Sequence, residues 1–194
     1  MDGDIVQKVK KFVEDEFRRH PHYSFDDWHI MYDHSVKVCE IANRIAEHLE
    51  CDRLLVSVGA LLHDIGKISE VDEETLHYDH EKLNLTVSEQ LLDSLGLSDE
   101  RLKKLKKIVS YQSNSPESRI IKDADALALY ADKRLYMAYI KWAHENKLES
   151  AIERKLNKFL KLNFEVSKSI GLEWFRQMSE DWEKHRSVGR AIEL

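Results

Sequence analysis

At 194 residues, with 42% apolar and 34% charged side chains, the chain has the composition of a globular domain with a sizeable core rather than of a disordered segment. Six Gly and two Pro are few for a turn-rich all-β architecture, so long helices joined by short loops are expected. The net charge of −6 argues against a general nucleic-acid binder, and two cysteines are too few for a disulfide framework.

The spacing of the apolar residues predicts helices along most of the chain. Residues 52–65 are apolar nearly all round and therefore predict the central helix of the core, with Asp52 as its N-cap and Gly66 just past its end. The other predicted helices cover 5–17, 30–49, 80–95 and 99–111, a helix with Asp123 and Asp125 after a turn at 113–116, and one or two long helices over 134–184, with loops at 20–28 and 67–79.

No repeat, low-complexity segment or linker interrupts this pattern, so we expect one all-α domain over residues 1–194. Asp2 and Asp4 break any apolar leader at the N-terminus. The longest apolar stretch, 54–62, is far too short to span a bilayer. The chain is therefore expected to form a helical bundle in the cytoplasm with no membrane partner.

His63 and Asp64 are polar residues at the end of the most apolar predicted helix. Burying an imidazole and a carboxylate there costs free energy unless both are satisfied. A metal ion would satisfy both, because neutral imidazole nitrogen and carboxylate oxygen are ligands of divalent metals. A buried hydrogen bond between His63 and Asp64 is the simpler alternative for an isolated pair.

His34 lies one turn before Val38 on the apolar stripe of its predicted helix, so it too faces the core. Two packed helices that each direct a histidine into the same core favour a shared metal site. Asp125 adds a carboxylate from a third predicted helix, just before Leu127. Taken alone, Asp125 would be interpreted as an exposed or capping acid.

Three runs that contain these residues resemble motifs of the HD-domain metal-dependent phosphohydrolases. The run His63-Asp64-Ile65-Gly66-Lys67 resembles the His-Asp signature in its His-Asp-Ile-Gly form. The run His34-Ser35-Val36-Lys37-Val38 resembles the first-histidine motif, His-x-x-Arg-Val, and residues 121–127 resemble the final motif, Asp-Ala-Asp-Arg-Leu. The resemblance covers about residues 25–135 and implies a bundle of the HD-domain type, with the helices at about 134–184 packed on it.

By this resemblance the metal ligands are His34, His63, Asp64 and Asp125. Asp125 is preferred to Asp123 because the ligand of the family directly precedes the Arg-Leu position. Two neutral imidazoles and two carboxylates balance one divalent cation, and mixed nitrogen and oxygen ligands favour Mn, Fe, Co, Ni or Zn over Mg. Such an ion would activate water, so the expected reaction is hydrolysis of a phosphate ester of a nucleotide or another small phosphorylated metabolite.

The phosphate of such a substrate needs cationic partners. We expect Asp64 and Lys67 to act in catalysis, and Lys67, Lys37, His80 and Gln112 to contact the substrate. His80 and Gln112 stand where relatives with two metals have additional histidines, so the glutamine favours a single ion. Each lysine could instead be a solvated surface residue. Carboxylates of the acidic loop after Lys67 are candidates for a general acid or base, and the sequence does not choose among them.

Other interpretations stay open on the sequence alone. The chain could be a non-catalytic metal-containing module that binds a ligand or nucleotide, which Ala126 and Gln112 favour because both replace family residues. The predicted ligands could also be separately satisfied polar groups with no metal. The basic cluster at 101–107 is most simply a solvated helix face, so a nucleic-acid partner is not expected. Tryptophans of the C-terminal helices are packing residues or part of an exposed patch that forms a homodimer.

Overall fold

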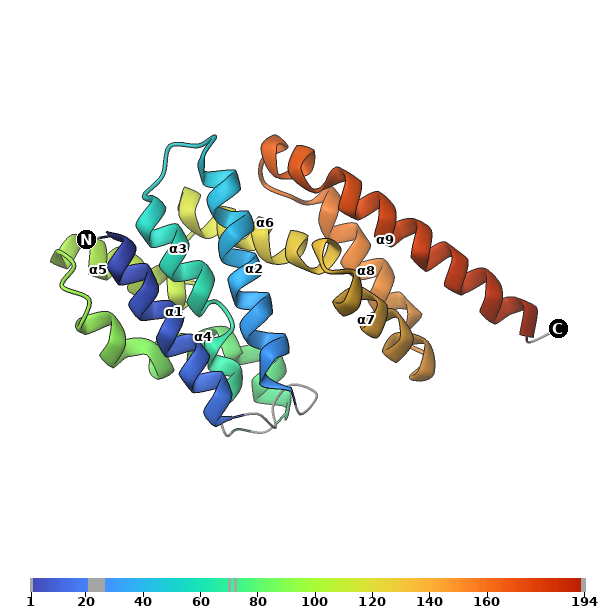
Figure 1. Ribbon diagram of the computed structural model, residues 1–194, viewed down its shortest axis with the longest axis horizontal. Helices are drawn as coiled ribbons and strands as arrows, with labels where there is room; N and C mark the ends of the chain where they lie inside the picture. Colours follow the sequence, from blue (N-terminus) through green and yellow to red (C-terminus); the bar gives the residue numbers. More distant parts are fainter. Residues whose placement is uncertain (1, 21–26, 70, 72, 193–194) are drawn as a thin grey trace. The chain divides into compact units, whose positions relative to one another are not determined.

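The computed structural model describes residues 2–20, 27–69, 71 and 73–192, although not the side chains of 73–81 and 187–192. These residues form α-helices and one short 3-10 helix, none lies in a strand, and no helix among them is long and apolar enough to cross a bilayer (Figure 1). The predicted all-α fold is confirmed. The elements are α1 (Asp2–Arg19), α2 (Trp28–Ala46), α3 (Arg53–Leu62), η2 (Ile65–Ile68), α4 (Glu73–Asp93), α5 (Asp99–Val109), α6 (Pro116–Ala131), α7 (Lys133–Glu145), α8 (Glu149–Leu160) and α9 (Glu165–Ile192).

The helices fall into two compact units, Met1–Ala124 and Asp125–Leu194, and the division lies inside α6. In the first unit, α3 packs against α1, α2 and α5, while α4 packs against η2 and α5. Figure 1 shows α1, α2 and α3 side by side in this unit. The single domain over residues 1–194 stays a prediction, as does the packing of the C-terminal helices on the motif-bearing core.

The N-terminus of α3 has the predicted cap. The carboxylate of Asp52 accepts hydrogen bonds from the backbone N–H groups of Leu54 and Leu55, at 3.1 and 3.3 Å. The guanidinium of Arg101, on α5, donates to the same carboxylate at 2.8 Å and holds the pKa of Asp52 below its ordinary value. Asp52 therefore stays ionised at neutral pH, where a negative charge stabilises a helix N-terminus.

The C-terminus of α3 differs from the prediction. The helix ends at Leu62, and Gly66 does not end it in a left-handed conformation. His63 and Asp64 instead form a turn that leads into η2. The backbone N–H of Gly66 donates to the side chain of Asn84 at 2.7 Å, so the turn after this helix is bonded to a residue far along the chain.

Two other boundaries were predicted wrongly. α4 begins at Glu73, so much of the predicted loop at 67–79 is helical. The segment 134–184 contains three helices rather than one or two, because Lys147 adopts a left-handed conformation (φ 57°) between α7 and α8 and residues 161–164 separate α8 from α9.

α3 is buried along nearly its whole length, as its apolar sequence predicts. Every residue from Leu54 to Leu62 is buried. Gly59 permits a close approach of neighbouring helices, because a Cβ atom built there would lie 2.7 Å from Ile121 Cδ1 and 2.8 Å from Ile108 Cγ2. The lack of a side chain at Gly59 therefore lets α5 and α6 pack tightly on α3.

Replacement of Gly59 by valine is expected to lower the free energy of unfolding by about 1–3 kcal/mol, because overpacking forces side chains and backbone apart. Urea-induced unfolding followed by circular dichroism measures this change. Gly3→Val is the matched control, since a Cβ atom at Gly3 meets no atom within 4 Å. Equal stability of the two variants would contradict the proposed close approach.

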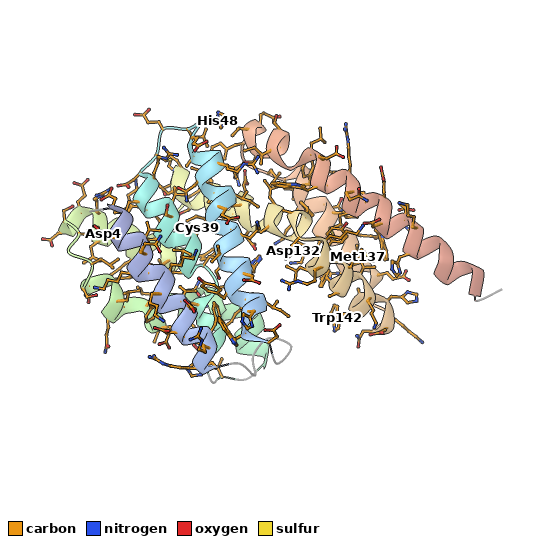
Figure 2. The ribbon with its side chains drawn as sticks, in the orientation of Figure 1. Asp4, Cys39, His48, Asp132, Met137 and Trp142 are labelled. Atoms are coloured by element: carbon orange, nitrogen blue, oxygen red, sulfur yellow. The ribbon has the colours of Figure 1, made fainter. Side chains whose placement is uncertain are left out.

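The second unit is joined by aromatic and polar contacts between its helices. The rings of Phe159 (α8) and Phe175 (α9) stack with centroids 4.2 Å apart. The hydroxyl of Tyr136 (α7) donates to Asp181 (α9) at 2.6 Å, and this bond lowers the pKa of the carboxyl to about 2. Trp142, labelled on α7 in Figure 2, is 40% exposed, so it is not a core residue of this unit. A homodimer formed through such a residue stays a prediction.

Candidate metal centre

His34 lies on the second turn of α2, on the side of the helix that packs in the first unit. Asp27 caps this helix, because its side chain accepts a hydrogen bond from the backbone N–H of His29. Ser35 and Val38 beside His34 are fully buried, and the imidazole of His34 itself is only 12% exposed. The predicted position of His34 on the apolar stripe therefore agrees with its burial.

His63 and Asp64 lie in the turn after α3, and both are buried. The Nδ1 atom of His63 lies 2.8 Å from the backbone oxygen of Ala60. A carbonyl oxygen only accepts hydrogen bonds, so Nδ1 is assigned the proton, and the neutral ring carries its lone pair on Nε2. A hydrogen bond of this kind fixes the tautomer and the orientation of a metal-binding imidazole.

The two imidazoles and the Asp64 carboxylate converge. Asp64 Oδ2 lies 3.5 Å from Nε2 of His63 and 4.0 Å from Nε2 of His34. The two imidazole ring centroids are 5.2 Å apart, with their planes inclined at 58°. Helix α2 and the turn after α3 therefore bring these three side chains together, as the predicted ligand set requires.

Asp125 lies on α6, directly after Ala124. One potential ligand atom from each of His34, His63 and Asp125 lies within 4.8 Å of the other two. Two ligand atoms on opposite sides of an ion at about 2.1 Å are about 4.2 Å apart, so small movements would close this group around one ion. Asp123, on the same helix, is buried but does not belong to this group. The geometry therefore favours Asp125 of the two aspartates.

The donor set fits a divalent transition metal. Imidazole nitrogen and carboxylate oxygen suit Mn, Fe, Co, Ni and Zn, and the tautomer of His63 directs its lone pair toward the other donors. His34, His63 and Asp125 would hold the ion, and Asp64 stands next to both histidines as the fourth predicted ligand. The identity of the metal stays a prediction.

Comparison with protein families finds a match to the HD-domain model over residues 31–130, which is more than half of the chain. The chain belongs to the HD-domain family. The match contains all four predicted ligands of this HD domain. Among curated proteins, no sequence matches the chain significantly.

Solved structures with the same fold include three from bacteria. An HD-superfamily hydrolase from Bacillus thuringiensis is 18% identical, with 98% of this chain and 100% of that chain covered and a TM-score of 0.74. Bacillus subtilis YpgQ in complex with ADP is 18% identical, with 96% of each chain covered and a TM-score of 0.69. A predicted HD-superfamily hydrolase from an uncultured Thermotogales bacterium is 19% identical, covers 94% and 91% of the two chains and has a TM-score of 0.62. At these identities the likeness shows the fold.

Lys67 of this HD domain lies in η2, next to the candidate centre. Its Nζ atom lies 2.5 Å from Asp64 Oδ2, and its side chain is 25% exposed. An ammonium carries a full positive charge and three N–H donors, so it can pair with carboxylates and phosphates. Lys67 therefore provides the positive charge closest in sequence to the HD pair, and its predicted roles in catalysis and substrate binding stay predictions.

Lys37 lies one turn after His34 but faces solvent. Its Nζ atom pairs with Glu40 at 2.8 Å, and the two side chains are 44% and 57% exposed. An exposed pair of this kind contributes little stability and can exchange its partner readily. The structure thus places Lys37 at the surface of α2, and contact with a substrate phosphate stays a prediction.

His80 and Gln112 are the other two predicted substrate contacts. His80 falls in α4, but its side chain lies outside the described residues. Gln112 is exposed just after α5 and lines a groove of about 400 Å³ together with the lysines Lys103, Lys106 and Lys107. No residue of the candidate metal group lines this groove. Substrate contact by His80 or Gln112 stays a prediction.

Asn84 is a residue of the site that the sequence-based prediction missed. It lies on α4, is fully buried, and donates from Nδ2 to the backbone oxygen of His63. Its Oδ1 atom accepts from the backbone N–H of Gly66, so one side chain bonds to both ends of the His63–Gly66 turn. An asparagine between Leu83 and Leu85 on a helix is the available signal, because a polar residue with low helix propensity in an apolar setting indicates a specific hydrogen-bonding role.

Proposed function

We propose that this HD-domain protein is a cytoplasmic metal-dependent phosphohydrolase that cleaves a phosphate ester of a nucleotide or of another small phosphorylated metabolite. The observation that carries the proposal is the convergence of His34, His63 and Asp125 within 4.8 Å, with the Asp64 carboxylate next to both imidazoles. Membership in the HD-domain family and the fold shared with HD-superfamily hydrolases support a hydrolytic reaction.

A divalent ion in such a site supplies Lewis acidity, which polarises a phosphoryl oxygen and activates a water molecule. The side chains of the protein hold and orient the reacting groups. The hydrogen bond to Ala60 keeps the ring of His63 in one tautomer. The Asp64 carboxylate pairs with the Lys67 ammonium, whose positive charge would favour a substrate phosphate beside the centre.

The preference for a nucleotide has separate support. Bacillus subtilis YpgQ, which shares the fold over 96% of both chains, binds ADP in its crystal structure. ADP carries the diphosphate and the nucleoside that a phosphohydrolase of this kind would recognise. The phosphate of a small metabolite without a base could bind the metal and pair with Lys67 in the same way. Both substrate classes therefore belong in the test.

Activity is expected when the purified protein is given Mn²⁺, Co²⁺ or Ni²⁺ together with a panel of nucleoside mono-, di- and triphosphates and a chromogenic phosphate ester. Phosphate release measures turnover, and a chelator should abolish it. The same panel is titrated by calorimetry to detect binding without turnover. Tight nucleotide binding with no hydrolysis in the presence of any of these metals would refute the proposed catalytic activity. It would support a non-catalytic binding module, which Ala126 and Gln112 favour because both replace residues of the family motifs.

A further inference from the structure

The carboxamide of Asn84 is buried near the HD pair and contacts three backbone groups. Nδ2 donates to the backbone oxygen of His63 at 2.5 Å and lies 3.4 Å from the backbone oxygen of Val109, on α5. Oδ1 accepts from the backbone N–H of Gly66 at 2.7 Å. Asn84 thus connects α4 to the turn after α3 and to the end of α5.

These partners require both halves of an amide. The carbonyl oxygens of His63 and Val109 can only accept, and the N–H of Gly66 can only donate, so the orientation of the Asn84 carboxamide follows from its partners. An aspartate of the same shape could accept from Gly66 but would turn a negatively charged oxygen toward the His63 carbonyl. Serine is too short to bond to both ends of the turn.

The turn that Asn84 holds carries two of the predicted metal ligands. His63 and Asp64 lie between the two backbone groups to which Asn84 bonds. The ring of His63 is oriented separately, by its bond to Ala60, so Asn84 acts on the backbone from which both side chains project. A shift of this turn would move Nε2 of His63 and the carboxylate of Asp64 relative to His34 on α2.

We propose that Asn84 is a positioning residue for the metal centre. Its carboxamide fixes the His63–Gly66 turn so that the His63 imidazole and the Asp64 carboxylate both face His34. This inference rests on the proposed metal-dependent function, but the hydrogen bonds of the turn can be tested without any metal. Asn84 does not touch the reacting groups and acts only through the turn.

The decisive experiment compares Mn²⁺ affinity in Asn84→Asp and Asn84→Ser with that in the wild-type protein, by competition with a chromogenic chelator. Both variants are expected to bind Mn²⁺ about 10- to 100-fold more weakly, the usual effect of removing a group that orients metal ligands. Ser88→Ala is the matched control. Ser88 is equally buried one turn further along α4, and its hydroxyl donates to the backbone oxygen of Asn84 at 2.6 Å.

Thermal unfolding of the metal-free proteins separates positioning from general destabilisation. The control is expected to retain wild-type Mn²⁺ affinity within about twofold, because Ser88 bonds to the backbone of Asn84, whereas the carboxamide of Asn84 holds the turn. If Asn84→Ser lowers the unfolding temperature as Ser88→Ala does but binds Mn²⁺ as tightly, the positioning role is refuted.

Amide exchange in the wild-type protein distinguishes failure of this inference from failure of the proposed function. The Gly66 amide proton is expected to exchange slowly without metal, because Asn84 holds it in a buried hydrogen bond. If the wild-type protein binds no metal, the proposed function fails and the exchange of Gly66 alone decides whether Asn84 holds the turn. Fast exchange of this proton would overturn the inference even if neither Asn84 variant folds.

Discussion

Replacement of Asp64 by alanine is expected to lower kcat/KM for the best substrate by at least about a thousandfold. The carboxylate lies beside Nε2 of both His63 and His34, so its removal takes away a predicted metal ligand. A catalytic metal contributes several kcal/mol to transition-state stabilisation, and each 1.36 kcal/mol corresponds to about a tenfold change in rate. The measurement is steady-state kinetics under the metal and substrate that give the highest wild-type turnover.

The Asp64 variant is expected to stay folded. Lys67, which loses its bond to Asp64, is 25% exposed, so its ammonium stays within reach of water. Asp93→Ala is the matched control, because Asp93 pairs with Lys106 at 2.8 Å on the exposed surface and takes no part in the candidate centre. Wild-type kcat/KM in a folded Asp64→Ala protein would rule out the assignment of Asp64 to catalysis.

Replacement of His63 by glutamine is expected to weaken binding of Mn²⁺ or Co²⁺ by at least about 100-fold, which is more than the loss of an orienting group causes. A neutral amide is a poor ligand for a transition metal, and the buried Nε2 atom of His63 faces Asp64 at 3.5 Å. Calorimetric titration of the metal-free protein measures both the affinity and the stoichiometry. One ion per chain is expected in the wild-type protein.

His48→Gln is the matched control for this change. His48 lies just after α2 and is exposed (Figure 2), so its replacement should leave metal affinity unchanged. Binding of two ions per chain would contradict the single-metal interpretation of Gln112. Equal affinity in the His63 and His48 variants would show that the imidazole of His63 is not a ligand.

The sequence alone determined the all-α fold class and the capped N-terminus of α3, and it predicted which residues meet at the candidate centre. The Asp52 cap and the apolar run of α3 act through neighbouring residues, so their effects are local and can be predicted from spacing. The positions of His34 and His63 follow in the same way, since each lies at a fixed place relative to an apolar stripe. Family motifs then selected Asp125, which the structure brings within 4.8 Å of both histidines.

Only the tertiary structure decided how the turn after α3 is held. The sequence predicts Gly66 just past the end of this helix, where a glycine commonly satisfies the last carbonyl groups locally. In the structure Asn84, 21 residues after His63 and 18 after Gly66, bonds to both ends of the turn. Such partners are chosen by the packing of α4 against η2, and hydrogen bonds over these separations leave no periodic pattern in the sequence.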